Sequence, residues 1–282
     1  GESKSDYEIV QEIAKKLGKE PKDLRVAVIF EDSLYGTTTS SYFVKKGILH
    51  GFKIPLVESY SAKAVDLSSL VMRLKEATPD VLFGVTYFND MVLFWRQAKE
   101  LNLNVKAFIS CGSVGSPKMV PILGDDINYL FNSFRLLGEF YEGKYTVDLS
   151  SFKPDAVAVL KDFFKRYTER HKVTMGEVPN TATLGFSGAW MLLHHVLPKC
   201  KSDNPEEVRK VALSMDLDYG IAPHGVGIKF AQPGHPHQGL NLKFVAGVFQ
   251  WQDKKFYCVW PKKFATKEPL IPMPTWEERK KK

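Results

Sequence analysis

The feature that most constrains this chain is an alternation, repeated through its first half, of short apolar runs with amphipathic helical segments. The runs are continuous, are rich in β-branched and aromatic residues, and end in polar or glycine-bearing loops. They fall at residues 25–30, 52–59, 80–84, 107–110 and 128–134. A strand buried on both faces has a continuous apolar sequence, whereas a strand with one solvated face alternates. The pattern therefore predicts an α/β fold, with parallel strands joined by helices that cover both faces of the sheet.

The second half of the chain has longer helical segments followed by a late group of strands. Helices are predicted at 153–168, 183–197 and 205–214, and β-like runs at 226–230, 243–251 and 255–260. Gln252-Asp253 is the expected hairpin turn between the last two runs. We therefore expect two lobes. Residues 1–135 together with 248–282 form one complete lobe, and residues 136–247 form the remaining part of another.

Composition limits the class of function. Charged residues make up 25% and hydrophobic residues 44%, as in an ordinary globular protein. No apolar run approaches the roughly eighteen residues that a membrane-spanning helix needs. The net charge is +7, and a large share of the excess lies in the proline-rich segment 261–282. We interpret this segment as an extended, solubilising tail, and we expect no nucleic-acid partner because no basic stretch carries interleaved aromatic residues.

Sequence motifs of catalysis and cofactor binding are absent. There is no GxGxxG, no GxxxxGK[ST] and no GxSxG, although Gly185-Phe186-Ser187-Gly188 approaches the last within a helical pattern. His224, His235 and His237 lie in a loop rich in proline and glycine, and we interpret them as surface residues rather than metal ligands. We therefore expect no enzyme, no cofactor and no metal site.

Three loops are the best candidates for a binding site, because ligands of open parallel sheets lie outside the carboxyl ends of the strands. The loops follow the runs at 25–30, 80–84 and 107–110. Their candidate residues are Ser33, Tyr35, Tyr87, Phe88, Asn89, Gly112 and Ser113. Aromatic rings, hydroxyl groups, an amide and backbone N–H groups suit a small polar or zwitterionic ligand.

Each candidate also has a purely structural interpretation. Tyr35 is equally expected to pack over the edge of the sheet. Of Tyr87 and Phe88, only one is expected to face a cleft, since side chains alternate along an extended backbone. Asn89 is expected rather to cap the helix that follows, and Ser113 offers the same alternative.

Several segments carry a family resemblance in a fixed order. They read RVAVIFEDSLYG, DLSSLVMRLKEATPDVLFGVTYFNDMVLFWRQAKELNL, FISCGSVGSPKMV, LGDDINYLF, VGIKFAQPGH and GVFQWQDKKFYCVWP. Together they resemble the type I periplasmic solute-binding proteins of ABC transporters, in particular the branched-chain amino-acid (Leu/Ile/Val) binding group. The resemblance spans roughly residues 22–261.

The resemblance implies two α/β lobes that close over a small amino acid, amide or carboxylate, as a Venus flytrap. It implies a substrate-binding component of an ABC importer, periplasmic or extracellular and associated with the membrane through its permease. The alternative is a ligand-sensing domain of a receptor or regulator on the same fold. By the same resemblance Tyr35 and one of Tyr87 and Phe88 line the cleft, and Phe186 is a further candidate.

Two departures from the family pattern accompany the resemblance. Gly112 stands where leucine-type members carry an acid that contacts the ligand ammonium, which leaves room for a ligand without that group. The βα units with which family members begin are also absent, so the first lobe is expected to be incomplete. A missing N-terminal segment, a second chain or dimerisation is therefore expected to complete it.

Overall fold

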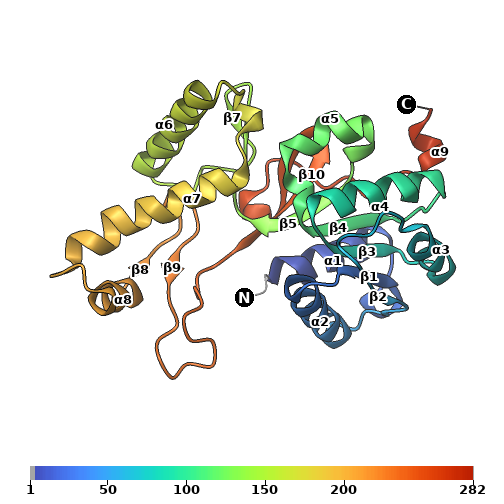
Figure 1. The fold of residues 1–282 in the computed structure, drawn as a ribbon, viewed down its shortest axis with the longest axis horizontal. Helices are drawn as coiled ribbons and strands as arrows, with labels where there is room; N and C mark the ends of the chain where they lie inside the picture. Colours follow the sequence, from blue (N-terminus) through green and yellow to red (C-terminus); the bar gives the residue numbers. More distant parts are fainter. Residues whose placement is uncertain (1–3, 282) are drawn as a thin grey trace.

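A computed structural model describes residues 4–281, except for the side chains of residues 4, 6 and 134. Its helices are α1 (Lys4–Lys16), α2 (Leu34–Leu49), α3 (Ser68–Ala77), α4 (Phe88–Glu100), α5 (Val120–Leu123), α6 (Pro154–His171), α7 (Asn180–Met191), α8 (Pro205–Leu213) and α9 (Trp276–Arg279). Its strands are β1 (Val26–Glu31), β2 (Val57–Tyr60), β3 (Val81–Thr86), β4 (Ala107–Gly112), β5 (Phe131–Arg135), β6 (Phe140–Tyr141), β7 (Lys144–Tyr145), β8 (Asp216–Leu217), β9 (Ile228–Lys229), β10 (Ala246–Gln252) and β11 (Lys255–Trp260). Figure 1 shows their arrangement.

A seven-stranded sheet in the order β11-β10-β5-β4-β3-β1-β2 organises most of the fold. The pairs from β2 through β1, β3 and β4 to β5 are parallel, as the continuous apolar runs predict. Strands β10 and β11 extend the sheet antiparallel to β5. The predicted α/β class with a mostly parallel sheet is confirmed. The parallel strands have the order of a doubly wound sheet, with β2 on one side of β1 and β3, β4 and β5 on the other. The topological switch point of the sheet therefore lies between β1 and β3.

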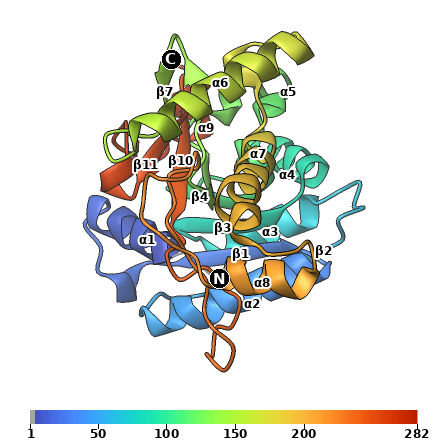
Figure 2. The same cartoon turned by 90° about the vertical axis from the view of Figure 1, so that its left-hand side faces the viewer.

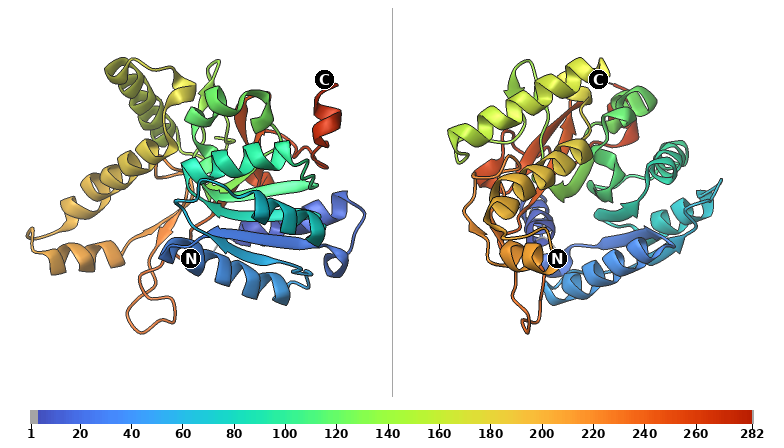
Figure 3. Two further views of the ribbon diagram at one scale, coloured as in Figure 1. Left: turned by 45° about the vertical axis from the view of Figure 1, so that its right-hand side comes forward. Right: turned by 60° about the vertical axis from the view of Figure 1, so that its left-hand side comes forward.

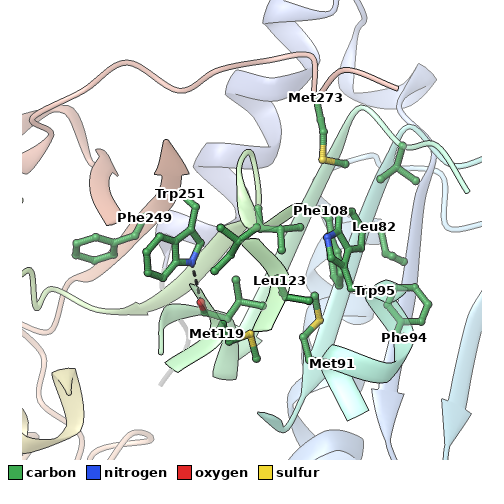
Figure 4. Close-up of a cluster of buried hydrophobic side chains, with 14 of the residues drawn as sticks. Leu82, Met91, Phe94, Trp95, Phe108, Met119, Leu123, Phe249, Trp251 and Met273 are labelled. Atoms are coloured by element: carbon green, nitrogen blue, oxygen red, sulfur yellow. Dashed lines mark hydrogen bonds between the residues drawn. The ribbon is translucent and has the colours of Figure 1, made fainter. Parts of the chain in front are cut away.

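Helices cover both faces of this sheet (Figure 3). Helices α1 and α2 bury side chains such as Ile9 and Phe43 against one face, together with Val28 and Phe83 from the strands. Helices α3 and α4 cover the opposite face, where Trp95 packs against Phe108 with ring centroids 5.5 Å apart. Figure 4 shows this second core, in which the indole of Trp251 donates a hydrogen bond of 2.7 Å to the carbonyl of Val114. Burial on both faces explains why the strands carry few polar residues.

The segment between β5 and β10 forms a separate, largely helical unit (Figures 1 and 2). Leu136, Val147, Phe152 and Val226 of this segment join the core beside the sheet, and its other buried apolar residues form two small clusters. One gathers Phe140, Leu160, Phe164 and Val178, and the other Met191, Val196, Met215, Ala222 and Ile228. Helix α7 continues into a π-helical turn, η6 (Leu192–Val196). Within residues 4–281, the regular sheet of this unit consists of the two-stranded pairs β6-β7 and β8-β9.

Three predicted boundaries were wrong for local reasons. Strand β2 begins at Val57 rather than at residue 52, because Pro55 has no N–H to donate to a ladder. Helix α2 begins at Leu34, within the predicted loop, because Ser33 caps it. The hairpin turn is Asp253-Lys254, one residue later than predicted. Both have positive φ, 52° and 59°, as a type I′ turn requires.

The C-terminal segment is not a solvated tail, so that interpretation was wrong. Trp276 is buried, and its indole N–H donates to the carbonyl of Leu103 at 2.8 Å. Its ring lies 4.8 Å from that of Trp95, and the guanidinium of Arg279 stacks 4.4 Å from it. Met273 adds a further buried side chain. The apolar residues therefore anchor this basic segment to the sheet.

Candidate functional site

A cavity of about 410 Å³ lies at the carboxyl ends of β3 and β4, next to the topological switch point between β1 and β3. Its lining comes from four stretches of chain that lie far apart in the sequence. The lining residues are Tyr35, Thr86, Tyr87, Phe88, Gly112, Ser113, Gly115, Ser116, Pro117, Pro179, Asn180 and Thr181. Its volume falls within the range of small-molecule sites.

The loop after β1 is held by a buried carboxylate. Glu31 is fully buried, and its two carboxylate oxygens accept hydrogen bonds from the backbone N–H of Ser33 at 2.6 Å and from the Ser33 hydroxyl at 2.8 Å. Ser33 in turn caps α2 by accepting from the N–H of Tyr35. A Cβ at Gly36 would lie 1.9 Å from the Glu31 carbonyl oxygen, so glycine is needed there for the helix to start so close to the strand. These contacts fix the position of Tyr35 at the cavity.

Tyr35 and Tyr87 form an aromatic wall of the cavity. Their ring centroids are 6.1 Å apart, and the Tyr87 hydroxyl lies 3.3 Å from the Ser33 hydroxyl. The Tyr35 hydroxyl reaches Cys111, 3.4 Å from its sulfur. Burial, followed by the neighbouring Cys111, raises the pKa of Tyr35, so its phenol stays protonated. The wall therefore offers two rings that each carry a hydroxyl group.

The connection after β3 is held in place by a second buried carboxylate. Asp90 is buried and accepts hydrogen bonds from the N–H of Tyr87 at 3.1 Å and from the Tyr60 hydroxyl at 2.5 Å. Tyr87 and Phe88 both line the cavity, and Phe88 also packs against the core. The expectation that only one of them would face the cleft rested on strand alternation. It does not hold because α4 begins at Phe88 and the alternation ends there.

The loop after β4 brings backbone close to the cavity. Gly112 has φ 129°, and a Cβ there would lie 2.6 Å from the carbonyl oxygen of Thr86. The Ser113 hydroxyl donates to the carbonyl of Tyr87 at 2.8 Å and lies 3.3 Å from the Thr86 hydroxyl. The loops after β3 and β4 are therefore tied together beneath the cavity.

The remaining wall comes from the helical unit, and sequence reasoning missed it. Pro179, Asn180 and Thr181 stand at the start of α7 and line the cavity. The predicted helix began at residue 183, after these residues. A proline directly before a polar pair and a helical pattern is a typical helix start, and this signal would have placed them correctly. Their distance in sequence from the three loops hides the contact itself.

Three sequence candidates lie outside the cavity lining. Ser33 does not line the cavity, but it caps α2 and its hydroxyl contacts the hydroxyl of Tyr87. Asn89 is exposed in the first turn of α4, so the expectation that it would cap this helix was wrong; Tyr87 precedes the helix and Asp90 binds its N–H. Phe186 lies in a separate groove against Phe163, with ring centroids 4.4 Å apart.

The lining of the cavity is mostly apolar and includes no formally charged side chain. Its polar groups are hydroxyls, the Asn180 amide and backbone groups. Among residues 4–281, no group of three or more histidine, cysteine or acidic side chains gathers in a way that would hold a metal ion. In the same part of the chain, the helices are too short or too polar to span a bilayer. This arrangement can enclose a small molecule by stacking and hydrogen bonding.

Comparison with known proteins places the chain in a family. The family profile described as "Periplasmic binding protein" matches residues 3–245. The "Leu/Ile/Val-binding protein homolog 7" of Brucella suis biovar 1 is 32% identical over 270 residues, and the match covers 93% of this chain and 61% of that protein. The chain thus spans about three fifths of the length of this curated relative. "Leu/Ile/Val-binding protein homolog 8" of Brucella melitensis is 27% identical, over 91% of this chain and 59% of that protein.

Solved structures with the same fold agree. The leucine binding protein of Thermotoga maritima MSB8 superposes with a TM-score of 0.66 at 16% identity, covering 95% of this chain and 64% of that one. An extracellular ligand-binding receptor of Rhodopseudomonas palustris HaA2 gives a TM-score of 0.68 at 17% identity, over 90% and 67% of the two chains. These neighbours confirm the predicted type I fold. With the profile match over most of its length, the chain belongs to the periplasmic binding proteins, a family of solute-binding proteins and not of enzymes.

Proposed function

We propose that this chain is the substrate-binding component of an ABC importer and binds a small amino acid, amide or carboxylate in the cavity beside Tyr35. The observation that carries the proposal is the position of the cavity. It lies at the carboxyl ends of the parallel strands and is closed from the other side by the start of α7. The names of the Brucella relatives, which refer to leucine, isoleucine and valine, point to the same class of ligand.

The proposed mechanism is closure of two lobes over the ligand. One lobe comprises residues 1–135 and 248–282, and residues 136–247 form part of the other. Tyr35, Tyr87 and Phe88 would stack on the ligand from the first lobe, while Asn180 and Thr181 would contact it from the second. A membrane permease would then take the ligand from the closed form. The family acts in the periplasm or outside the cell, and association with the membrane would be through this permease.

We also propose that further polypeptide, either another segment or a second chain, covers the exposed face of α7 and η6. Leu192 and Leu193 are 41% and 58% exposed there. The curated relatives are longer than this chain. Native mass spectrometry of the purified protein would detect a second chain directly, and a monomer of the mass of this chain alone would exclude a second chain as the cover.

The binding site can be tested with two neighbouring variants. A thermal-shift screen of amino acids, amides and small carboxylates would provide a ligand for calorimetry. Tyr35→Ala should then weaken binding by roughly 2- to 12-fold, the equivalent of one lost stacking contact of about 0.5–1.5 kcal/mol. Leu34→Ala is the matched control, because Leu34 is 82% exposed and does not line the cavity. Equal affinities for wild type and Tyr35→Ala would show that the ligand binds elsewhere, and no binding by any compound would refute the proposal.

A further inference from the structure

The hairpin formed by β6 and β7 connects the helical unit to the edge of the sheet. It follows β5 along the chain and contacts β11, the terminal strand of the sheet. The N–H of Phe256 in β11 donates to the hydroxyl of Tyr141 at 3.4 Å, and the N–H of Cys258 donates to the carbonyl of Thr146 at 3.0 Å. These bonds satisfy donors that an edge strand otherwise exposes. This contact, the hairpin junction, therefore covers the edge of the sheet.

A buried carboxyl group lies behind the hairpin junction. Glu139 is completely buried, and its Oε2 accepts a hydrogen bond from the same Tyr141 hydroxyl that accepts from Phe256. Its Oε1 has no hydrogen-bond partner among the described residues. The N–H of Glu139 donates to the Thr146 hydroxyl, and its carbonyl accepts from the Thr146 N–H, both at 2.9 Å. One tyrosine thus links the carboxyl group to the edge strand.

The ionisable side chains packed at this position are neutral. Tyr141 binds the Glu139 carboxyl group, and Tyr145 lies on the neighbouring strand β7. Burial raises the pKa of both phenols, so they keep their protons. On β11, burial raises the pKa of Cys258 to about 12. These groups give no positive charge to balance an ionised Glu139.

The charged groups of the junction bind one another instead. Lys255 on β11 donates to the exposed Glu142 at 2.7 Å, and its ammonium group lies 6.0 Å from the centre of the Tyr141 ring. Lys144, the other charged residue of the hairpin, is exposed. A negative charge on Glu139 would therefore be stabilised by one hydrogen bond from a neutral phenol, which does not offset the loss of its hydration.

Close packing prevents the Glu139 carboxyl group from reaching water while the hairpin stays in place. A Cβ at Gly138 would lie 2.6 Å from the hydroxyl oxygen of Thr146 and 3.0 Å from a methyl carbon of Val147. The backbone beside Glu139 therefore has no room to shift towards the second strand of the hairpin. Separation of the hairpin from β11 is the movement that would admit water to the carboxyl group.

We infer that the hairpin junction is a proton-dependent contact, in which neutral Glu139 keeps the hairpin on β11 and loss of its proton favours separation. Ionisation favours the separated form because water hydrates the carboxylate there. Since the junction joins the helical unit to the sheet, the connection between them loosens as the pH rises. The inference does not depend on the proposed ligand site.

The size of the effect follows from the proton affinities of the two forms. Burial raises the pKa of Glu139 from 4.5 to about 8 in the closed junction, and hydration in the separated form returns it towards 4.5. The closed junction binds the proton more tightly, so its stabilisation is complete below pH 4.5 and is lost as the pH rises to about 8. Between pH 6.5 and 8 the equilibrium constant for separation should rise about 15-fold.

Amide hydrogen exchange, measured by NMR and corrected for its intrinsic pH dependence, tests the inference on the wild-type chain. The protection factors of the Phe256 and Cys258 amides should fall about 15-fold between pH 6.5 and 8. At each pH they should be lower than those of the central strand β3, because the junction separates locally. Constant protection over this range would overturn the inference. Protection equal to that of β3 would also overturn it, since exchange would then require unfolding of the whole sheet.

Two variants identify the titrating group. Glu139→Gln keeps the shape of the side chain but cannot ionise, so protection at Phe256 and Cys258 should stay constant between pH 6.5 and 8. Glu142→Gln is the matched control three residues away and should keep the change of about 15-fold. Circular dichroism would show that both variants are folded. A wild-type loss of protection in Glu139→Gln, or its disappearance in Glu142→Gln, would assign the proton to another group and overturn the inference.

Discussion

Glu139 gives a prediction about stability whose sign and size follow from its surroundings. It lies between β5 and β6 and is completely buried. One carboxyl oxygen accepts a hydrogen bond from the Tyr141 hydroxyl, and the other, Oε1, has no partner among the described residues. Burial raises the pKa of Glu139 from about 4.5 to about 8. The folded chain therefore holds a proton in a pH range where the unfolded chain has lost it.

The stabilisation linked to this proton is complete below pH 4.5 and is lost as the pH rises to about 8. The difference in pKa corresponds to about 5 kcal/mol over the whole range. The range above pH 6.5 is the most informative. His224 is partly buried, contrary to its predicted surface position, and burial lowers its pKa to about 4, so most of its opposite contribution is made below pH 6.5. From pH 6.5 to 8 the wild type should lose about 2 kcal/mol of its free energy of unfolding.

Glu139→Gln removes the titration and keeps the shape of the side chain. Urea unfolding between pH 6.5 and 8 should then show a nearly constant free energy for this variant, in contrast to the wild type. Glu142→Gln is a matched control three residues away. Glu142 is exposed and bound to Lys255 at 2.7 Å, and this ion pair lowers its pKa, so its titration lies far below the range. A wild-type stability that does not change over this range, or the same loss in Glu139→Gln, would refute the reasoning.

Three further changes test the fold and the cavity. Trp276→Ala should cost about 3–5 kcal/mol in urea unfolding, because it empties the space against Trp95, whereas Glu277→Ala on the exposed side of the same turn should cost less than about 0.5 kcal/mol. Gly112→Ala should destabilise the chain by about 1–3 kcal/mol through its φ of 129° and its contact with Thr86, and an unchanged melting temperature would contradict that geometry. Gly185→Ala should instead stabilise α7 by about 0.5–1 kcal/mol, since no atom lies within 4 Å of the added methyl group, and a lower melting temperature would show that this face is occupied.

The parallel sheet could be predicted because its strands are buried on both faces and leave a continuous apolar signal, as in residues 26–30. The hydrophobic pattern of the sequence was less informative where side-chain hydrogen bonds determine the position of a helix end. Helix α2 starts at Leu34, a largely exposed leucine that contributes nothing to an amphipathic pattern, and its start depends on the Ser33 cap. The C-terminal segment was misread for the opposite reason. Its lysines dominate the composition, but Trp276 and Met273 determine where it packs.

For the candidate site, the rule that ligands bind at the carboxyl ends of parallel strands identified the three loops, but it did not identify the wall formed by the start of α7. Tyr35, Tyr87 and Ser113 follow strands that are neighbours in the sheet or one strand apart, so their proximity follows from topology. Asn180 and Thr181 reach the cavity from a unit that is not part of the sheet. The hydrophobic periodicity of the strand segments and of α7 contains no information about this contact. Whether the residues of the cavity bind a ligand stays a prediction.

The junction between the sheet and the helical unit has a consequence for how such a chain can vary in evolution. Arg135, the last residue of β5, pairs with Ala246, the first residue of β10. The polypeptide that departs at one of these positions comes back directly opposite it. In topological terms, β5 and β10 form an antiparallel hairpin, and all the residues between them form its loop. Insertions and deletions within them leave the register of β5 and β10 unchanged, so the length of this unit can drift while the sheet stays the same.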